Sequence, residues 1–437
     1  MRCFVTGAYG FIGQEIVRAL YRQGHTVICS GRDVALGRRL IPNCDWQHTD
    51  FNQLLSPDDW RPYLADIDVV INCVGILQTT FRDDIQRIHA TATEALFKAC
   101  ETAGVQRLVH ISAMSAETEI NTAYAQSKVE ADRQLEKTKL NWVIVKPSLV
   151  IGRGSFGGTS LMRGLAGLPL ILPVPGSGKQ RFQPIALEDL AMGIANLVGG
   201  KNFETVNHTT LFAAGPDAEE LGEIFRSLRR WLGFPRARSL YIPLSLLKPA
   251  LWIGDFIGWL GHNTAMRSTS IAQLTYDSVV DSIPFEKATG VRARSFQEIL
   301  EDQPATIQDR VHARLFFWTP ILQLLIAFFW IVTGVITFIP AVFTAGVNVL
   351  VQGGVSSLFA HLLVALGAVA DIVLGILFIL PRTVRLSGIA QIGLIFCYLL
   401  VLTILAPDLW GDPLGPLLKV IPLTGAIALV MALQEKR

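Results

Sequence analysis

The sequence has few charged residues for its length. Only 17% of its 437 residues are charged, 51% are hydrophobic, and the formal net charge is +2. Soluble domains usually carry about 25% charged residues, so this deficit indicates that part of the chain lies in a membrane. The near-neutral balance provides no excess of cations for a polyanion, which argues against nucleic acid as a partner.

Cysteine is also scarce, and its spacing is not that of a metal site. The sequence has no Cys-x-x-Cys pair and no accompanying run of histidines; the six cysteines stand at positions 3, 29, 44, 73, 100 and 397. This pattern argues against both a disulfide framework and a zinc site, and we expect no bound metal.

The N-terminus shows no secretory signal. Residues 1–7 (MRCFVTG) lead directly into a predicted strand, without an apolar stretch followed by a small-residue cleavage site. We therefore expect the first domain to stay in the cytoplasm, where thiols are reduced.

Long apolar segments are confined to the C-terminal third. We place the boundary between a domain of residues 1–305 and a second domain of residues 306–437. Four segments have close to the length of about 20 residues that crosses a bilayer: Leu315–Ile339, Leu358–Leu380, Leu386–Leu405 and Leu414–Leu433. They predict an all-α domain of four transmembrane helices in contact with membrane lipid. Ala341–Gly354 is a candidate re-entrant piece, and Lys419 must extend to the interface or pair.

Basic residues near these segments all fall on one predicted side. They precede the first span, separate the second from the third and follow the fourth: Arg310, Arg314, Arg382, Arg385, Lys436 and Arg437. Cations that flank spans are retained on the cytoplasmic side. We therefore expect an integral protein of a bacterial-type cytoplasmic membrane, with its catalytic domain and both termini in the cytoplasm.

The N-terminal two thirds alternate short apolar runs with helical patterns, as a parallel sheet with crossover helices requires. The predicted strands are Cys3–Thr6, Val27–Ser30, Trp46–Thr49, Val69–Asn72, Leu108–Ser112 and Trp142–Val145. This order predicts an α/β fold with a doubly wound, Rossmann-type sheet. Residues from about 150 to 300 are richer in Gly and Pro and predict a smaller substrate lobe.

A glycine-rich loop follows the first strand and precedes a helical pattern. Gly7, Gly10 and Gly13 have the spacing that lets a backbone turn tightly, approach a pyrophosphate and pack the helix on the sheet. With Phe11 and Ile12, they place backbone N–H groups at a helix N-terminus, which favours an anion. The loop therefore predicts a dinucleotide site.

The end of the second predicted strand bears on the choice of cofactor. An acidic residue there would bind the ribose hydroxyls of NAD, whereas an arginine favours the extra phosphate of NADP. Gly31 stands at the tip and Arg32 follows, which favours NADP, with Arg38 as a possible helper. Asp33 leaves NAD possible, because the alignment shifts easily by two residues, and a solvated Arg32 is the plain alternative.

Two further strand ends should complete the cofactor site, since ligands bind beyond the carboxyl ends of such strands. Asp50 and Phe51 follow the third strand and are placed to reach adenine. Val74 and Gly75 follow the fourth and are placed to pass beneath the ribose.

A tyrosine and a lysine stand four residues apart in a helical pattern after the fifth strand. Tyr124 and Lys128 therefore share one helix face. An ammonium beside the phenol would lower the pKa of Tyr124 and make it a general acid or base for a carbonyl or hydroxyl. Ser112, at the end of the fifth strand, is the favoured hydroxyl to polarise the same substrate oxygen, and Ser115 is its competitor.

These motifs together resemble the extended or atypical short-chain dehydrogenases/reductases. The similarity includes the glycine loop, Ser112, Tyr124-x-x-x-Lys128 and two runs, Val145–Gly152 (VKPSLVIG) and Gln183–Ala191 (QPIALEDLA). Within that group the chain is most similar to the branch that contains the nucleotide-binding accessory subunit of respiratory complex I. The tail resembles the DoxX-like four-helix membrane family.

The resemblance implies a role for each matched residue. Tyr124 would donate or accept the proton, Lys128 would bind the nicotinamide ribose, Ser112 would orient the substrate, and Pro147 would lie beside the nicotinamide. Some atypical members bind the cofactor without known turnover.

Three functions agree with these patterns. The first is an NADP-dependent reductase, dehydrogenase or epimerase with a small, lipophilic substrate. The second is an NADP-binding scaffold or redox sensor for a membrane-protein partner. The third makes the membrane domain the working part, because His361 and Asp371 lie in the second predicted span, where ionisable groups are costly. The apolar segment Leu240–Gly261 could line a pocket, rest on a membrane or pack in the core.

Overall fold

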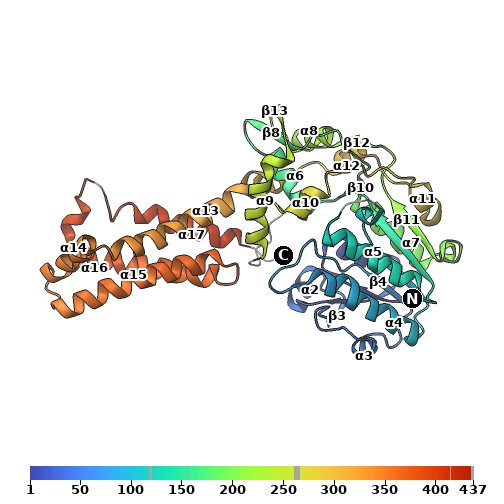
Figure 1. Ribbon diagram of the computed structural model, residues 1–437, viewed down its shortest axis with the longest axis horizontal. Coiled ribbons are helices and arrows are strands. Elements are labelled where there is room, and N and C mark those ends of the chain that lie inside the picture. Colours follow the sequence, from blue (N-terminus) through green and yellow to red (C-terminus); the bar gives the residue numbers. More distant parts are fainter. Residues whose placement is uncertain (118–120, 155, 260–265, 414, 435–437) are drawn as a thin grey trace. The chain divides into compact units, whose positions relative to one another are not determined.

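The computed structural model describes residues 1–117, 121–154, 156–259, 266–413 and 415–434. Gly261, Leu414, Lys436 and Arg437, which belong to predicted segments, lie outside these residues. The chain forms two compact units, Met1–Ala313 and Arg314–Arg437 (Figure 1). The predicted domain boundary after residue 305 stays a prediction.

The first unit is built on a seven-stranded sheet with the order β11-β6-β5-β4-β1-β2-β3, and all its strand pairs are parallel. The strands are β1 Arg2–Thr6, β2 Thr26–Gly31, β3 Asp45–His48, β4 Val69–Asn72, β5 Arg107–Ile111, β6 Trp142–Pro147 and β11 Thr209–Ala213. β1, β4 and β5 are almost wholly buried, as expected of strands covered on both faces. The predicted α/β Rossmann-type fold is confirmed.

Helices cover the sheet through two separate cores. One core includes buried side chains of α1 (Phe11–Arg22), α7 (Leu187–Gly199) and α11 (Ile283–Thr289). The other includes those of α3 (Pro57–Trp60), α4 (Ala92–Ala103) and α5 (Ala123–Glu136).

The strand order reverses between β1 and β4, and ligands bind at the carboxyl ends of strands beside such a reversal.

A third core marks the smaller lobe. It joins α6 (Gly157–Ala166), α8 (Leu221–Trp231), α12 (Phe296–Asp302) and β8 (Ile171–Pro175). β13 (Arg238–Ile242) pairs in parallel with β8 and leads into α9 (Leu244–Trp259), beside which α10 (Ser268–Ala272) packs. Short pairs complete the lobe: β7 Val150–Ile151 with β10 Ile185–Ala186, and β9 Arg181–Phe182 with β12 Glu219–Glu220.

The second unit is all-α. Its helices are α13 Ile307–Thr337, which begins in the first unit, α14 Pro340–Gln352, α15 Ser357–Ile379, α16 Val384–Leu405 and α17 Val420–Leu433. Three of them, α13, α15 and α16, are long and apolar enough to cross a membrane. The candidate re-entrant piece forms the shorter apolar helix α14.

The fourth predicted span forms a shorter helix than expected. α17 has 14 residues, which is about 21 Å at 1.5 Å per residue, short of a hydrocarbon core of about 30 Å. The helix begins at Val420, so residues 415–419 of the predicted span lie outside it.

The end of α17 nevertheless lies beside the start of α16. Gln434 donates a hydrogen bond to Gln323 at 2.9 Å, and its carbonyl accepts one from Arg385 at 3.4 Å. Arg385 and Gln434 therefore share one end of the helical bundle, as the predicted topology requires. Which side of the membrane this end faces stays a prediction.

Candidate cofactor and active site

The glycine loop is packed too tightly for side chains. Gly7 has a φ of +62°, in the left-handed region, and a Cβ there would lie 3.1 Å from the Cys73 carbonyl. A Cβ on Gly13 would lie 2.3 Å from the Gly7 oxygen. Gly10, whose N–H donates to that same oxygen at 2.9 Å, precedes α1. The first turn of α1 has no acidic residue, so its N–H groups and dipole suit a pyrophosphate.

Phe11 and Ile12 begin α1 at this edge of the sheet. The Phe11 ring stacks on Phe156 of the smaller lobe, with ring centroids 5.5 Å apart. Helix α1 thus starts where the two lobes of the first unit meet.

Arg32 is held by an ion pair that the sequence did not suggest. Its guanidinium contacts the Asp83 carboxylate, which also accepts a hydrogen bond from the Asn52 amide at 2.9 Å. The Arg32 side chain remains 44% exposed. A ribose phosphate can therefore reach Arg32, but it must compete with Asp83.

The Asp33 side chain has a structural role as a helix cap. Its carboxylate accepts a hydrogen bond from the Leu36 N–H at 2.9 Å and caps α2 (Val34–Leu40). Gly31 is required to be small, because a Cβ there would lie 2.4 Å from the Tyr9 ring. Because the Asp33 carboxylate already caps α2, Arg32 is the better-placed residue at this strand end to contact the cofactor ribose. Arg38 lies in the last turn of α2.

Asp50 and Phe51 follow β3, and their side chains have different surroundings. The Asp50 carboxylate accepts a hydrogen bond from the Asn52 N–H at 3.0 Å. The Phe51 side chain is buried and packs edge-on against Trp60 at 4.9 Å between centroids. Contact between Phe51 and adenine would therefore have to come from its backbone.

Val74 and Gly75 lie beside the predicted lysine. The Val74 N–H donates to Asn72 at 3.3 Å, and a Cβ on Gly75 would lie 3.7 Å from the Lys128 ammonium. Lys128 is buried and donates to the Ile111 carbonyl at 3.0 Å. Burial lowers the pKa of Lys128 to about 8, although the Asp132 carboxylate opposes this shift.

The predicted pKa shift of Tyr124 is reversed. Desolvation, helped by the negative charge of Asp132, raises the pKa of Tyr124 to about 12. The Lys128 ammonium donates its hydrogen bond to the Ile111 carbonyl. Tyr124 is therefore a phenol throughout the physiological range and suits proton donation.

The two candidate serines have different surroundings. Ser112 is buried and donates to Asp132 at 2.9 Å. Ser115 is also buried, and its interaction with Tyr276 partly opposes the rise that burial and the charge of Tyr124 cause in the pKa of Tyr276. Ser115 is thus associated with Tyr276, whereas Ser112 is committed to Asp132.

Pro147, the fourth residue of the implied nicotinamide site, ends β6 and pairs with Ala213 of β11. It immediately follows the buried Lys146.

A buried acid on α5 was missed. Asp132 accepts hydrogen bonds from Ser112 and from Lys146, both at 2.9 Å, and lies 3.6 Å from His110. Lys146 also contacts the Glu117 carboxylate. The spacing of Tyr124, Lys128 and Asp132 at i, i+4 and i+8 was the available signal, because it puts all three on one helix face.

His89 was missed as well, and no local pattern marks it. Its Nε2 accepts from the Ile76 N–H at 2.9 Å, and its Nδ1 lies 2.8 Å from the Ser127 hydroxyl. Its ring lies edge-on to Tyr124 at 5.7 Å. Burial holds the pKa of His89 well below its usual range, so the ring is neutral and orders the chain around Tyr124.

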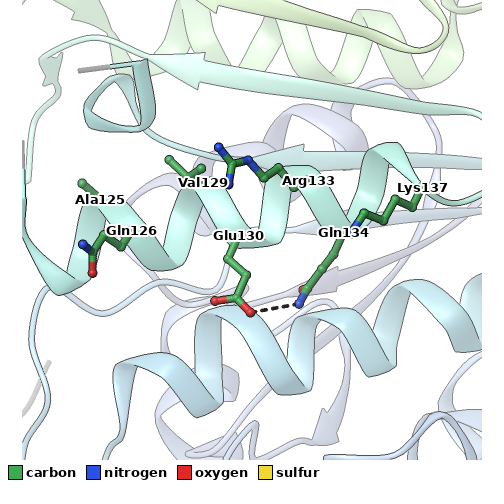
Figure 2. A pocket seen from close by; sticks show the side chains of 7 residues that line it. All are labelled: Ala125, Gln126, Val129, Glu130, Arg133, Gln134 and Lys137. Atoms are coloured by element: carbon green, nitrogen blue, oxygen red, sulfur yellow. Dashed lines mark hydrogen bonds between the residues drawn. The ribbon is translucent and has the colours of Figure 1, made fainter. Parts of the chain in front are cut away.

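The face of α5 opposite Tyr124 and Lys128 borders a separate hollow. This hollow of about 550 Å³ lies along the helix. Figure 2 shows the side chains that line this hollow, among them Glu130, which accepts a hydrogen bond from Gln134 at 3.4 Å. Tyr124 and Lys128 are not among them, so this hollow is separate from the predicted active site.

In the second unit, Asp371 and His361 do not act together. The buried Asp371 accepts from the Tyr398 hydroxyl at 3.2 Å, which joins α15 to α16. His361 contacts the Ser357 carbonyl at 2.7 Å. The two residues are ten positions apart on α15, or about 15 Å along the helix.

Comparison with known proteins agrees with both halves of this structure. Residues 7–160 match the NAD(P)H-binding family, and residues 327–428 match the DoxX-like family. The chain joins an NAD(P)-binding Rossmann domain to a DoxX-like domain. With its three long apolar helices, the DoxX-like domain indicates a membrane protein.

Relatives of the NAD(P)-binding domain differ in function. The rat mitochondrial NADH dehydrogenase (ubiquinone) 1 alpha subcomplex subunit 9 is 26% identical over 276 residues, which cover 58% of this chain and 66% of the subunit. This chain therefore spans just under two thirds of that relative's length. The ceramide reductase of Caulobacter vibrioides is 27% identical over 192 residues, which cover 43% of this chain and 57% of the reductase.

The fold has a counterpart in an NAD-bound dTDP-glucose 4,6-dehydratase from Bacillus anthracis. That structure covers 69% of this chain and 94% of its own, with a TM-score of 0.53 and 14% identity. The likeness shows that the NAD(P)-binding domain has this fold.

The Asp132–Lys146 pair gives the first prediction. Asp132→Leu should destabilise the NAD(P)-binding domain by about 3 kcal/mol, because it leaves a buried ammonium with a weaker set of partners. Lys146→Met should restore part of this loss when the two are combined. We would measure urea unfolding of residues 1–313 in a double-mutant cycle. Asp58→Leu, which removes an exposed partner of Arg61, is the control and should change stability by less than about 1 kcal/mol. Additive losses for the Asp132 and Lys146 variants would contradict the pairing.

Proposed function

We propose that this chain is a membrane-anchored, NADP-dependent reductase of the short-chain dehydrogenase/reductase type, with a lipophilic carbonyl substrate. The observation that carries the proposal is Tyr124, a phenol kept protonated by its surroundings, one helical turn from the buried Lys128. General acids of this kind contribute about 100- to 10,000-fold to a rate.

The residues present fit the cofactor. A Cβ at Gly7 or Gly13 would clash with neighbouring backbone, so these glycines hold the loop against the start of α1, whose N–H groups suit a pyrophosphate. The glycine loop would bind the pyrophosphate, and Lys128 would donate hydrogen bonds to the nicotinamide ribose. The bound cofactor supplies a hydride for the carbonyl carbon.

Tyr124 would then deliver its proton to the carbonyl oxygen, so that the substrate gains one hydride and one proton and becomes an alcohol. Ser112 was the predicted partner hydroxyl for this oxygen. Its hydrogen bond to Asp132 commits it to that carboxylate, so we favour Ser115, which interacts with Tyr276, instead. The lysine keeps its positive charge near the site because Asp132 opposes the effect of burial.

The membrane domain supports the proposal of a lipophilic substrate. A DoxX-like domain places the reductase at a bilayer, where a tether raises its effective concentration near a lipid substrate. The similarity to a protein named ceramide reductase points the same way.

A second candidate is a cofactor-binding scaffold for a membrane complex. It is favoured by similarity to a protein named as a subunit of NADH dehydrogenase, which also implies a membrane-protein partner. A scaffold would need the phosphate-binding end of the site but not Tyr124.

NADPH should bind more tightly than NADH. Arg32→Ala should weaken NADPH binding by about 10- to 100-fold, since a hydrogen bond with a charged group contributes about 1.5 to 3 kcal/mol, and should leave NADH nearly unchanged. Calorimetric titration of both cofactors would measure this, with Arg22→Ala on the exposed face of α1 as the control. Equal affinities in the wild type would remove the basis for NADP.

Turnover should depend on Tyr124. Tyr124→Phe should lower NADPH oxidation with long-chain keto lipids in nanodiscs by about 100-fold or more, because the proton donor is lost, while NADPH affinity changes little. Tyr63→Phe, which alters an aromatic side chain packed against Trp60, is the matched control. If Tyr124→Phe turns over an identified substrate at the wild-type rate, the reductase mechanism fails.

A further inference from the structure

Helix α9 exposes large apolar side chains on one face. At 100° per residue they fall on one side of the helix, and each is 49% to 70% exposed: Leu246, Trp252, Ile253, Phe256 and Trp259. Leu251, Gly254 and Gly258 form the buried, opposite side. Exposed apolar patches of this kind mark an interaction surface.

The orientation of α9 is fixed by close packing of its buried side. A Cβ on Gly254 would lie 1.7 Å from the Met266 carbonyl oxygen, and one on Gly258 would lie 2.1 Å from Arg267 Nε. The helix therefore has no room to rotate and bury its aromatic face. That face stays outward, where water is an unfavourable neighbour.

Further exposed apolar side chains lie in the strands that lead to the helix. Strand β13 precedes α9 and carries the exposed Leu240 and Tyr241, which point to opposite faces of the strand. Its partner β8 begins with the exposed Ile171, which follows the exposed Leu170. We call the outward face of α9 the α9 surface.

The chain segment that carries this surface is mainly basic. Five basic residues and one acidic residue lie between Arg229 and Trp259. Four of the basic residues are exposed: Arg230, Arg236, Arg238 and Lys248. The acid, Asp255, is occupied, because its carboxylate accepts hydrogen bonds from Gln78 and from the Ser268 N–H, both at 3.0 Å. Aromatic and aliphatic side chains flanked by cations suit the interface of an anionic bilayer.

A bilayer is also within reach of this domain. Helix α13 begins against it, where Asp309 pairs with buried Arg163 at 3.2 Å and His312 lies 3.0 Å from Ser160. The same helix continues into a segment apolar enough to span the membrane. The NAD(P)-binding domain is thus connected to lipid by an unbroken helix.

We propose that the α9 surface lies in the headgroup region of an anionic bilayer, as a membrane contact separate from the spanning helices. This inference rests on the chain being a membrane protein and not on its catalytic activity. Helix α9 also contacts a loop next to the candidate site: the Phe81 N–H donates to the Trp259 carbonyl at 3.3 Å, and the Gln78 amide donates to Asp255 at 3.0 Å. Both belong to the loop that carries Asp83, the partner of Arg32.

Under the proposed function, a lipid substrate would leave the bilayer at the α9 surface and pass this loop to reach the site. The loop between Gln78 and Asp83 would then be the first part of the site that the substrate meets.

Photocrosslinking in the full chain tests the contact. We would incorporate p-benzoylphenylalanine at position 256, reconstitute the protein in nanodiscs of phosphatidylcholine with phosphatidylglycerol, and identify crosslinked species by mass spectrometry. Position 21 is the control, because Tyr21 is exposed to a similar extent on α1. NADPH titration of each variant would show that the domain is folded.

The proposal predicts lipid adducts at position 256 at least about fivefold above those at position 21, and fewer in pure phosphatidylcholine. Arg236→Glu combined with Arg238→Glu should lower the yield at position 256 in the anionic discs. Adducts at 256 no more frequent than at 21, or adducts mainly to peptides of this chain, would overturn it. Because the readout is lipid attachment, it is independent of whether the chain reduces a carbonyl.

Discussion

The approach of Gly7 to Gly13 is the constraint on which the site depends. The Gly7 oxygen occupies the space that a Cβ of residue 13 would fill, at 2.3 Å. Through this contact the start of α1 is pressed against the carboxyl ends of β1 and β4, where the strand order reverses. A side chain at position 7 or 13 would push the helix away and remove the anion site that its N–H groups form.

Once the sheet edge is fixed, burial and one carboxylate set the charge states around it. Burial raises the pKa of Tyr124, and Asp132 adds to this rise; Asp132 also opposes the lowering that burial causes in the pKa of Lys128. It therefore favours a protonated phenol and a charged ammonium on the same face of α5. A buried carboxylate is costly, and here Ser112 and Lys146 compensate it with hydrogen bonds at 2.9 Å. The same side chain thus links stability to the proton-donating state of Tyr124.

Local patterns were sufficient to predict most of the first unit. Most of its central strands are short apolar runs, and the spacing of the glycine loop fixes its backbone directly, so neither prediction depends on distant residues. Side-chain partners were harder to predict. Arg32 and Asp83 are 51 positions apart, and Ser115 interacts with Tyr276, which is distant in sequence. No local periodicity indicates such pairs. The fourth span is a different case: hydropathy predicted it from residue 414, whereas α17 begins only at Val420.

The central claim is that this membrane protein transfers a hydride and does not merely hold its cofactor. The most direct measurement uses the full chain in nanodiscs with NADPH carrying deuterium at C4 and a pool of membrane lipids that includes keto lipids. The account predicts deuterium on the carbinol carbon of a lipid product, detected by mass spectrometry, when both 4R- and 4S-labelled cofactors are tested. Tight binding of NADPH with no deuterium in any lipid from either cofactor would contradict it and favour a cofactor-binding scaffold.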